Sequence, residues 1–322
     1  MSTIAPTLHE GDASPALKEG TGRSEAGTTP AESDTSSVAL GKTPISANDR
    51  IPHVRIRPHA GRGAIDFGEI ARYGDLLLTL TDRDIKVRYK QTVLGVLWVV
   101  LQPLIASLIF AFVFGIVAGL SSNGRPYVLF AFAGLTAWNT FANVLSRASG
   151  SIVSNAHIVS KVYFPRLLLP FSAAASTLVD LAVSLGVMAL MMAFYRVVPG
   201  WPVLLLPVWI VVLLLMALGL GMMSGALMVR YRDIGYVVPV ALQLGMYASP
   251  VAWATEAVPE QYRWFVQMNP LCGLIEAFRW SLLGQSTLHL HWLGYSVVTS
   301  LVVFWLGAVV FKRLEQDFAD VI

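Results

Sequence analysis

A dense group of basic side chains stands immediately before a long uncharged stretch of the sequence. The members of this group are Arg83, Lys86, Arg88 and Lys90, with Tyr89 among them. Cations at the edge of a hydrophobic span attract anionic lipid headgroups, each with about 1 kcal/mol of stabilisation. The same charges can bind an anionic group of a ligand. The basic group is therefore a candidate for lipid contact, for ligand binding, or for both.

A single carboxylate, Asp180, lies inside the apolar stretch from Leu167 to Tyr195. An ionisable group within a membrane span is costly, which makes it a functional candidate. In a transporter driven by protons, Asp180 would be the group that binds and releases them. The spans offer no basic residue or histidine as its partner, so a role in packing or hydrogen bonding is an equal alternative.

Residues for covalent, metal or nucleotide chemistry are scarce. Cys272 is the single cysteine, which excludes an intrachain disulfide and a cysteine-based metal site. The tripeptide Gly41-Lys42-Thr43 is like the end of a phosphate-binding loop, but Ser36 stands where that loop needs a glycine. We therefore expect no enzyme activity and no cofactor or metal on this chain. If ATP drives the protein, ATP and magnesium bind to another polypeptide.

The composition indicates the class of protein that must position these residues. Of the 322 residues, 55% are hydrophobic and only 13% are charged, whereas a soluble domain carries about 25% charged residues. The charged residues are concentrated in the first 92 positions, where basic and acidic side chains balance. This pattern excludes a water-soluble protein with a single core and predicts an all-α polytopic membrane protein with a polar N-terminal extension.

Six segments are long and apolar enough to span a membrane. They are Val93–Leu120, Tyr127–Ser146, Leu167–Tyr195, Val197–Val229, Ile234–Thr255 and Leu293–Phe311. With the N-terminus in the cytoplasm, far more Lys and Arg residues flank the inner ends of these spans than the outer ends. The positive-inside rule then predicts a multi-pass membrane protein with both termini in the cytoplasm.

A seventh apolar stretch, Trp264–Gly284, is interrupted by Pro270 and carries Glu276 and Arg279. Charges near the bilayer centre are unfavourable, so we expect two short external helices that dip into the membrane and return. Glu276 and Arg279 are three residues apart, and we expect them to pair on one helix face.

Three regions follow from these patterns. Residues 1–66 have no aromatic residue and are rich in small and polar residues, which predicts a disordered cytoplasmic tail. Residues 67–92 form an amphipathic interface and gate region, because apolar residues recur at helical spacing from Phe67 to Leu80. Residues 93–322 form the transmembrane domain.

Several segments carry a more specific resemblance. They are Leu80–Trp98, Asn155–Pro170 with the sequence Lys-Val-Tyr-Phe-Pro-Arg inside it, Arg230–Ile234, Ser249–Val251 and Met268–Leu271. In order and spacing, residues 67–322 resemble the permease subunit of ABC polysaccharide exporters, the family that moves O-antigen, capsule and teichoic acid chains. The resemblance implies a complex of two such subunits with two ATPase subunits.

The resemblance also assigns roles to individual residues. The loop between the second and third spans would be the coupling segment that docks on the ATPase, and its candidate residues are Asn155, Lys161, Phe164, Pro165 and Arg166. An ordinary turn between two helices is the alternative. The basic group with Tyr89 would form the entrance where the pyrophosphate of a lipid-linked sugar chain first engages.

Aromatic residues are frequent in the spans and in the external segment. Sugar rings stack on aromatic faces, so Trp98, Trp138, Tyr247 and Trp253 are candidates for the lining of a glycan channel. Aromatic residues also belong at membrane interfaces and in helix packing, which is the competing explanation for each of them.

The sequence thus predicts the membrane subunit of an ATP-driven exporter that moves a lipid-linked, O-antigen-like polysaccharide across the inner membrane as a homodimer. Two alternatives stay open. The same fold could export a lipid or a drug, or the protein could be a proton-coupled secondary transporter that uses Asp180.

Overall fold

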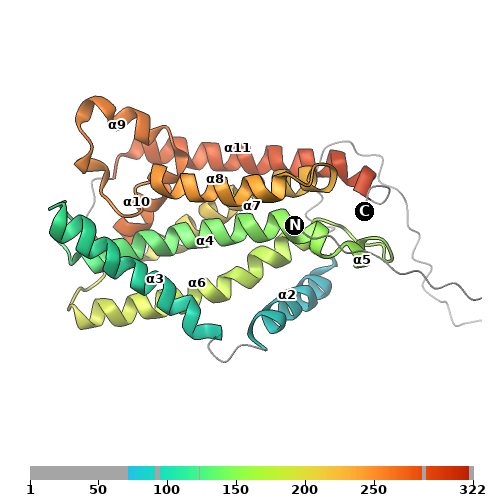
Figure 1. Ribbon diagram of the computed structural model, residues 1–322, viewed down its shortest axis with the longest axis horizontal. Helices are drawn as coiled ribbons and strands as arrows, with labels where there is room; N and C mark the ends of the chain where they lie inside the picture. Colours follow the sequence, from blue (N-terminus) through green and yellow to red (C-terminus); the bar gives the residue numbers. More distant parts are fainter. Residues whose placement is uncertain (1–71, 91–94, 123, 285–287, 319–322) are drawn as a thin grey trace, which may run out of the picture. The chain divides into compact units, whose positions relative to one another are not determined.

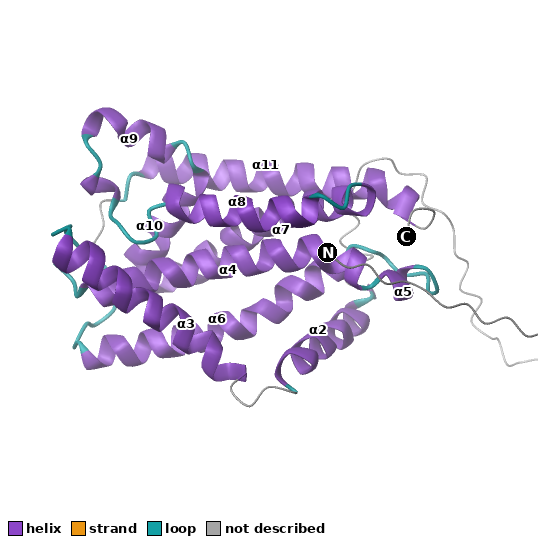
Figure 2. Cartoon of the chain, viewed as in Figure 1, coloured by secondary structure: helices purple, strands orange, loops and turns teal. Residues whose placement is uncertain are grey.

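The computed structural model describes residues 72–90, 95–122, 124–284 and 288–318 (Figure 1). The predicted disordered tail, residues 1–66, and the start of the predicted interface helix lie outside these described residues. Every regular element in the described part of the chain is a helix (Figure 2). Five of the helices are long and apolar enough to cross a membrane. The described part of the chain is therefore all-helical, and the protein is a polytopic membrane protein.

The helices follow one another along the chain as a bundle with short helices at its two ends. The long ones are α3 (Gly95–Phe110, continued by the π-helix η1, Ala111–Val117), α4 (Tyr127–Ser154), α6 (Leu168–Phe194), α7 (Leu206–Arg230, preceded by the 3-10 helix η2, Trp201–Leu205) and α11 (Leu290–Leu314). The short ones are α2 (Gly74–Tyr89), α5 (Ala156–Val159), α8 (Ile234–Ala248), α9 (Glu260–Gln267) and α10 (Pro270–Leu283), with 3-10 turns η3 (Thr255–Ala257) and η4 (Glu315–Asp317).

The predicted fifth span is shorter than its sequence suggests. Helix α8 ends at Ala248, and not at Thr255, because Ser249 precedes Pro250 and adopts an extended backbone. Its 15 residues extend for only about 22 Å, less than the hydrocarbon core of about 30 Å. The bundle therefore has five long apolar helices and one shorter apolar helix in place of six full-length spans.

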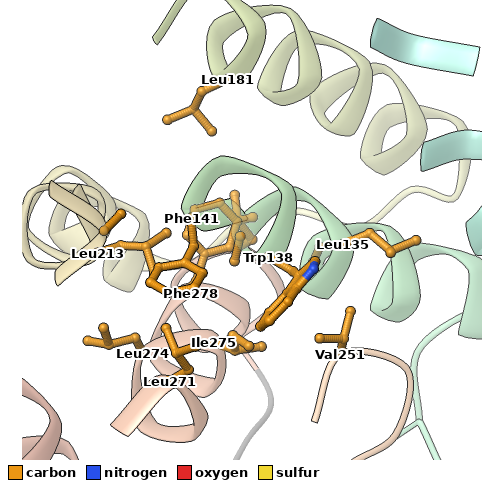
Figure 3. Packing of buried hydrophobic residues seen from close by; sticks show 14 of the residues in the cluster. Leu135, Trp138, Phe141, Leu181, Leu213, Val251, Leu271, Leu274, Ile275 and Phe278 are labelled. Atoms are coloured by element: carbon orange, nitrogen blue, oxygen red, sulfur yellow. The ribbon is translucent and has the colours of Figure 1, made fainter. Parts of the chain in front are cut away.

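Helix α4 forms the centre of the bundle. It packs against α3, α6, α7, α8 and α10, and 78% of its most apolar window is buried within the chain, against 17% for α3. Figure 3 shows part of the resulting core, in which Phe141 of α4 lies near Leu213 of α7 and Phe278 of α10, while Trp138 of α4 lies toward Ile275 of α10. The elements around α4 are thereby held in fixed positions relative to it.

Small residues allow the closest helix contacts. Gly307 of α11 lies so close to Gly219 of α7 that a Cβ atom would overlap the Gly219 carbonyl oxygen. Gly221 and Gly225 of α7, which are four residues apart, pack against Ala148 and Ser149 of α4. These contacts are therefore between helices of one chain, which the spacing of the glycines alone left undecided.

The two ends of the bundle differ. Helices α9 and α10 lie at one end, here called the α9 end, in agreement with the two short helices expected between residues 264 and 284 (Figure 1). Helix α5 and the last turns of α11 lie at the other end, the α5 end. Helix α2 lies along the half of α6 nearest the α5 end and packs against it.

Candidate functional site

The basic group predicted as an entrance lies on α2, and its charges are mostly compensated within that helix. Arg83 contacts Asp84 at 2.8 Å, and Lys86 contacts Asp82 at 2.6 Å. Lys90 follows the last turn and is exposed. The Lys86–Asp82 pair is exposed and the Arg83–Asp84 pair is half-buried. An exposed pair contributes at most about 1 kcal/mol, so Lys86 in particular stays available to a ligand or to lipid.

Arg88 and Tyr89 have a different environment, because both reach Asp180 in the middle of α6. Arg88 donates a hydrogen bond to one carboxylate oxygen of Asp180 and Tyr89 donates to the other. The side chains of Arg88 and Asp180 are only 16% and 10% exposed. Burial, followed by the nearby Asp180 carboxylate, raises the pKa of the Tyr89 phenol and keeps it a donor.

Asp180 therefore has a basic partner, although that partner does not come from one of the predicted spans. The partner comes from α2, which the sequence places before the first span, and it reaches the middle of α6 because α2 packs along that helix. Arg88 and Asp180 are 92 residues apart in the sequence. No local sequence pattern therefore indicated that they pair. Asp180, Arg88 and Tyr89 together fasten the end of α2 to α6.

A polar pocket of about 240 Å³ opens beside this ion pair, between α3, α4 and α6. Its polar lining residues are Arg88, Gln102, Thr136, Asn139, Thr140, Asn143, Arg147, Thr177, Asp180 and Ser184. The apolar remainder includes Trp98 of α3, whose side chain is half exposed. A pocket this polar within a membrane protein lies next to water or to a polar ligand.

The polar stripe on α4 is the part of this pocket that sequence reasoning missed. The predicted second span ended at Ser146 and placed Arg147 in the following loop, but α4 continues to Ser154. Thr136, Thr140, Asn143 and Arg147 recur at spacings of three or four residues, which puts them on one helix face. This spacing could have revealed the stripe from the sequence.

The predicted coupling segment contains the four-residue helix α5 and is joined to α2. Phe164 is buried in a cluster with Leu80 of α2, Val159 of α5, and Leu168 and Leu169 at the start of α6. The segment and α2 therefore share one buried apolar cluster. The rest of the segment leaves apolar side chains exposed at the α5 end.

The other residues of the segment are fixed by polar contacts or lie in solvent. Asn155 donates to the Ser151 carbonyl oxygen at 2.7 Å, where α4 ends. Arg166 donates to the Glu315 carbonyl oxygen and lies over the ring of Phe318, which ties the segment to the C-terminal end of α11. Pro165 stands between Phe164 and Arg166, and Lys161 is exposed.

The four aromatic residues predicted for a channel lie in different environments. Trp98 and Tyr247 are more than half exposed. Trp138 is buried in the core, where it contacts Gly245 and the ring of Phe141, and Trp253 is half-buried. Trp98 and Tyr247 are thus the two that present large aromatic surfaces outside the chain's own core.

At the α9 end, Arg279 is buried and makes different contacts from those expected. It donates to the carbonyl oxygens of Val251 and Trp253 and lies over the ring of Phe130 at 3.8 Å from the centroid. The expected ion pair with Glu276 is absent from the salt bridges of the described residues. Arg279 instead binds the backbone after α8, where Pro250 interrupts the helix.

A family model described as an ABC-2 type transporter matches residues 75–283, from the first turn of α2 to the end of α10. The match covers the basic group, the polar pocket, the coupling segment and the two short helices at the α9 end. The chain belongs to the ABC-2 type transporter family. An ABC-2 permease is a transport component without a catalytic domain, as the sequence predicts.

Relatives of this ABC-2 permease align with it along nearly their whole lengths. An O-antigen export system permease protein of Klebsiella pneumoniae is 28% identical over 252 residues, which are 77% of this chain and 95% of the relative. Its counterpart in Myxococcus xanthus is 27% identical over 254 residues, or 78% and 97%. A capsule polysaccharide export inner-membrane protein of Neisseria meningitidis is 24% identical over 241 residues, or 73% and 89%.

Proposed function

We propose that this ABC-2 permease exports a lipid-linked polysaccharide from the cytoplasm across the inner membrane, with ATP hydrolysed by a separate pair of subunits. The observation that carries the proposal is the alignment with the permeases named for O-antigen and capsule export, along nearly their whole lengths. The predicted orientation puts the α5 end and both termini in the cytoplasm.

The coupling segment is the proposed contact with the ATPase. Exposed Val162 and Tyr163 beside Lys161 offer a mixed apolar and basic surface at the α5 end. Phe164 and Leu80 link that surface to α2 in one buried cluster. Closure of the ATPase pair would therefore move the segment and α2 together, and α2 ends in the entrance residues Arg88 and Tyr89.

The translocation path is proposed along the interface of two copies of the chain. Helices α3 and α8 present apolar side chains that the chain itself does not cover, which suits a lipid or a second copy as neighbour. The exposed rings of Trp98 and Tyr247 lie on these two helices and would contact sugar faces. Trp138 and Trp253, which are buried and half-buried, would pack behind the residues that line the path and would not contact the sugar directly.

Inverted membrane vesicles test this function directly. The chain is coexpressed with a candidate ATPase subunit before the vesicles are prepared. ATP should drive uptake of a lipid-linked polysaccharide into the vesicles, whereas a non-hydrolysable ATP analogue should not. Transport without an ATPase, or without ATP, would exclude the proposal.

Export of a lipid or drug by the same fold is the second candidate, and the same vesicles distinguish it. Uptake of an unglycosylated polyprenyl phosphate at the rate of the glycan-bearing form would favour a lipid exporter. A proton-driven mechanism is less well supported, because the Asp180 carboxylate is engaged by Arg88 and Tyr89.

A further inference from the structure

The polar pocket between α3, α4 and α6 is lined by hydrogen-bond donors, and several of them have no acceptor among the described residues. The hydroxyls of Thr136 and Thr140 bond to carbonyl oxygens of their own helix. By contrast, no hydrogen bond or ion pair among the described residues engages the side chains of Asn139, Asn143 and Arg147, of which Asn143 is exposed and the other two are half-buried. The pocket therefore presents amide and guanidinium donors to whatever fills it.

The charges around the pocket do not balance. Asp180 is matched by Arg88, so Arg147 adds one positive charge to a pocket set among membrane-spanning helices. Charged side chains inside spans pair with an opposite charge or face a functional cavity, because isolation from water is costly. A ligand that carries a negative charge would supply the missing partner.

The remaining lining residues indicate a sugar. The half-exposed indole of Trp98 offers an aromatic face, while Gln102, Asn139 and Asn143 offer amides that both donate and accept hydrogen bonds. The volume of about 240 Å³ is below the range of about 300–1,000 Å³ that holds drug-sized ligands. The pocket is thus suited to a small polar group such as one sugar ring.

We propose that this pocket binds a sugar ring that carries a phosphate, the group by which a polysaccharide is joined to its lipid carrier. Arg147 would bind the phosphate, the amides of α4 would bind ring hydroxyls, and Trp98 would cover one ring face. The inference rests on the proposed export function and assigns to it a binding site separate from the exposed cations of α2.

Ligand-detected nuclear magnetic resonance on the full chain in lipid nanodiscs tests the site. The probes are glucose 1-phosphate, glucose and inorganic phosphate. We expect glucose 1-phosphate to bind more tightly than either of the others, and Arg147→Gln to weaken it about tenfold, the effect of losing one hydrogen bond to a charged group. Equal binding of inorganic phosphate, an unaffected Arg147→Gln variant, or no binding of glucose 1-phosphate would each overturn the proposal.

Matched variants separate the pocket from general charge and folding effects. Arg232→Gln removes one positive charge at an exposed position outside the pocket, and it should leave the affinity unchanged. Asn143→Ala should weaken glucose 1-phosphate more than inorganic phosphate, because it removes a hydroxyl contact and no charge. Thermal unfolding of each variant should match that of the parent chain, which shows that the lost binding is local.

The transport assay distinguishes failure of this site from failure of the proposed function. If vesicles transport without ATP, the export proposal fails whatever the probes show. If ATP-driven export continues at the parent rate in Arg147→Gln and glucose 1-phosphate still binds that variant, only the pocket assignment fails. We expect slower export from Arg147→Gln while its association with the ATPase is unchanged.

Discussion

The Asp180 carboxylate holds the end of α2 against α6 through Arg88 and Tyr89. Asp180→Asn removes the negative charge and leaves Arg88 nearly buried without its partner. Removing one partner of a buried ion pair lowers the free energy of unfolding by about 3–5 kcal/mol. We therefore expect a marked loss of thermal stability. Unfolding of the purified variant in detergent measures it.

A charge exchange shows what kind of role Asp180 has. In the double variant Arg88→Asp with Asp180→Arg, an ion pair can form again, so stability and ATP-driven export should recover in part. A group that carries protons cannot be replaced by arginine. Export that stays absent in a double variant with restored stability would therefore favour the proton-coupled alternative.

Phe164 offers a second test at the level of single residues. Its side chain is 6% exposed, whereas that of the adjacent Tyr163 is 72% exposed. Phe164→Ala leaves a cavity between the coupling segment and α2, with an expected loss of about 3–5 kcal/mol. ATP hydrolysis by the complex should then continue while export falls, as measured in the same vesicles.

Tyr163→Ala is the comparison for that variant, because it removes a neighbouring aromatic side chain that lies outside the cluster. We expect it to leave stability unchanged and to weaken association with the ATPase. If Phe164→Ala reduced hydrolysis and export in equal proportion, the segment would not transmit movement through this cluster.

Among the residues, the sequence supported a role for the basic group and for Asp180 but did not connect them. Their contact depends on α2 packing along α6, and neither helix carries a local pattern that predicts its partner. The sequence predicts Arg147 in a loop, because the predicted second span ends at Ser146, the last residue before this charge. In the fold, α4 continues for two further turns.

At the scale of elements, the tightest contact is that between α7 and α11 at Gly219 and Gly307. Any side chain at position 307 overlaps backbone of α7, so Gly307→Leu should force the two helices apart. Gly294→Ala in the same helix meets nothing within 4 Å and should be neutral or slightly stabilising, since alanine favours helix more than glycine does.

The fraction of monodisperse protein after detergent extraction checks this prediction. We expect that fraction to fall sharply for Gly307→Leu and to stay at the parent level for Gly294→Ala. Equal behaviour of the two variants would show that the contact between α7 and α11 is looser than described.

The long helices could be predicted from the sequence because uncharged apolar stretches of sufficient length have few alternatives in a membrane. The details that failed are those set by single residues. Helix α8 ends at Ala248, before Pro250. Arg279 donates hydrogen bonds to the backbone carbonyl oxygens of Val251 and Trp253 and forms no ion pair with Glu276 among the described residues. Competition between a nearby carboxylate and backbone oxygens depends on geometry that the sequence does not display.

At the scale of the whole molecule, the two ends of the bundle should face opposite sides of the membrane. The single native cysteine, Cys272, is buried, so an engineered cysteine can be labelled against little background. A membrane-impermeant maleimide should label Tyr262→Cys on α9 in intact spheroplasts, and Lys161→Cys only after permeabilisation. Labelling of both from the same side would contradict the predicted orientation.

The central position of α4 has a consequence for biosynthesis. Helix α4 carries the polar stripe and is the most buried of the long helices, yet its neighbours α7, α8 and α10 follow it in the chain. When α4 leaves the ribosome, none of these three helices exists to cover it. The packing around α4 is therefore completed only when the later helices have been made. A nascent chain that stopped after α6 would have the helices that face the polar stripe, but it would lack those that cover the apolar face of α4 with Trp138 and Phe141.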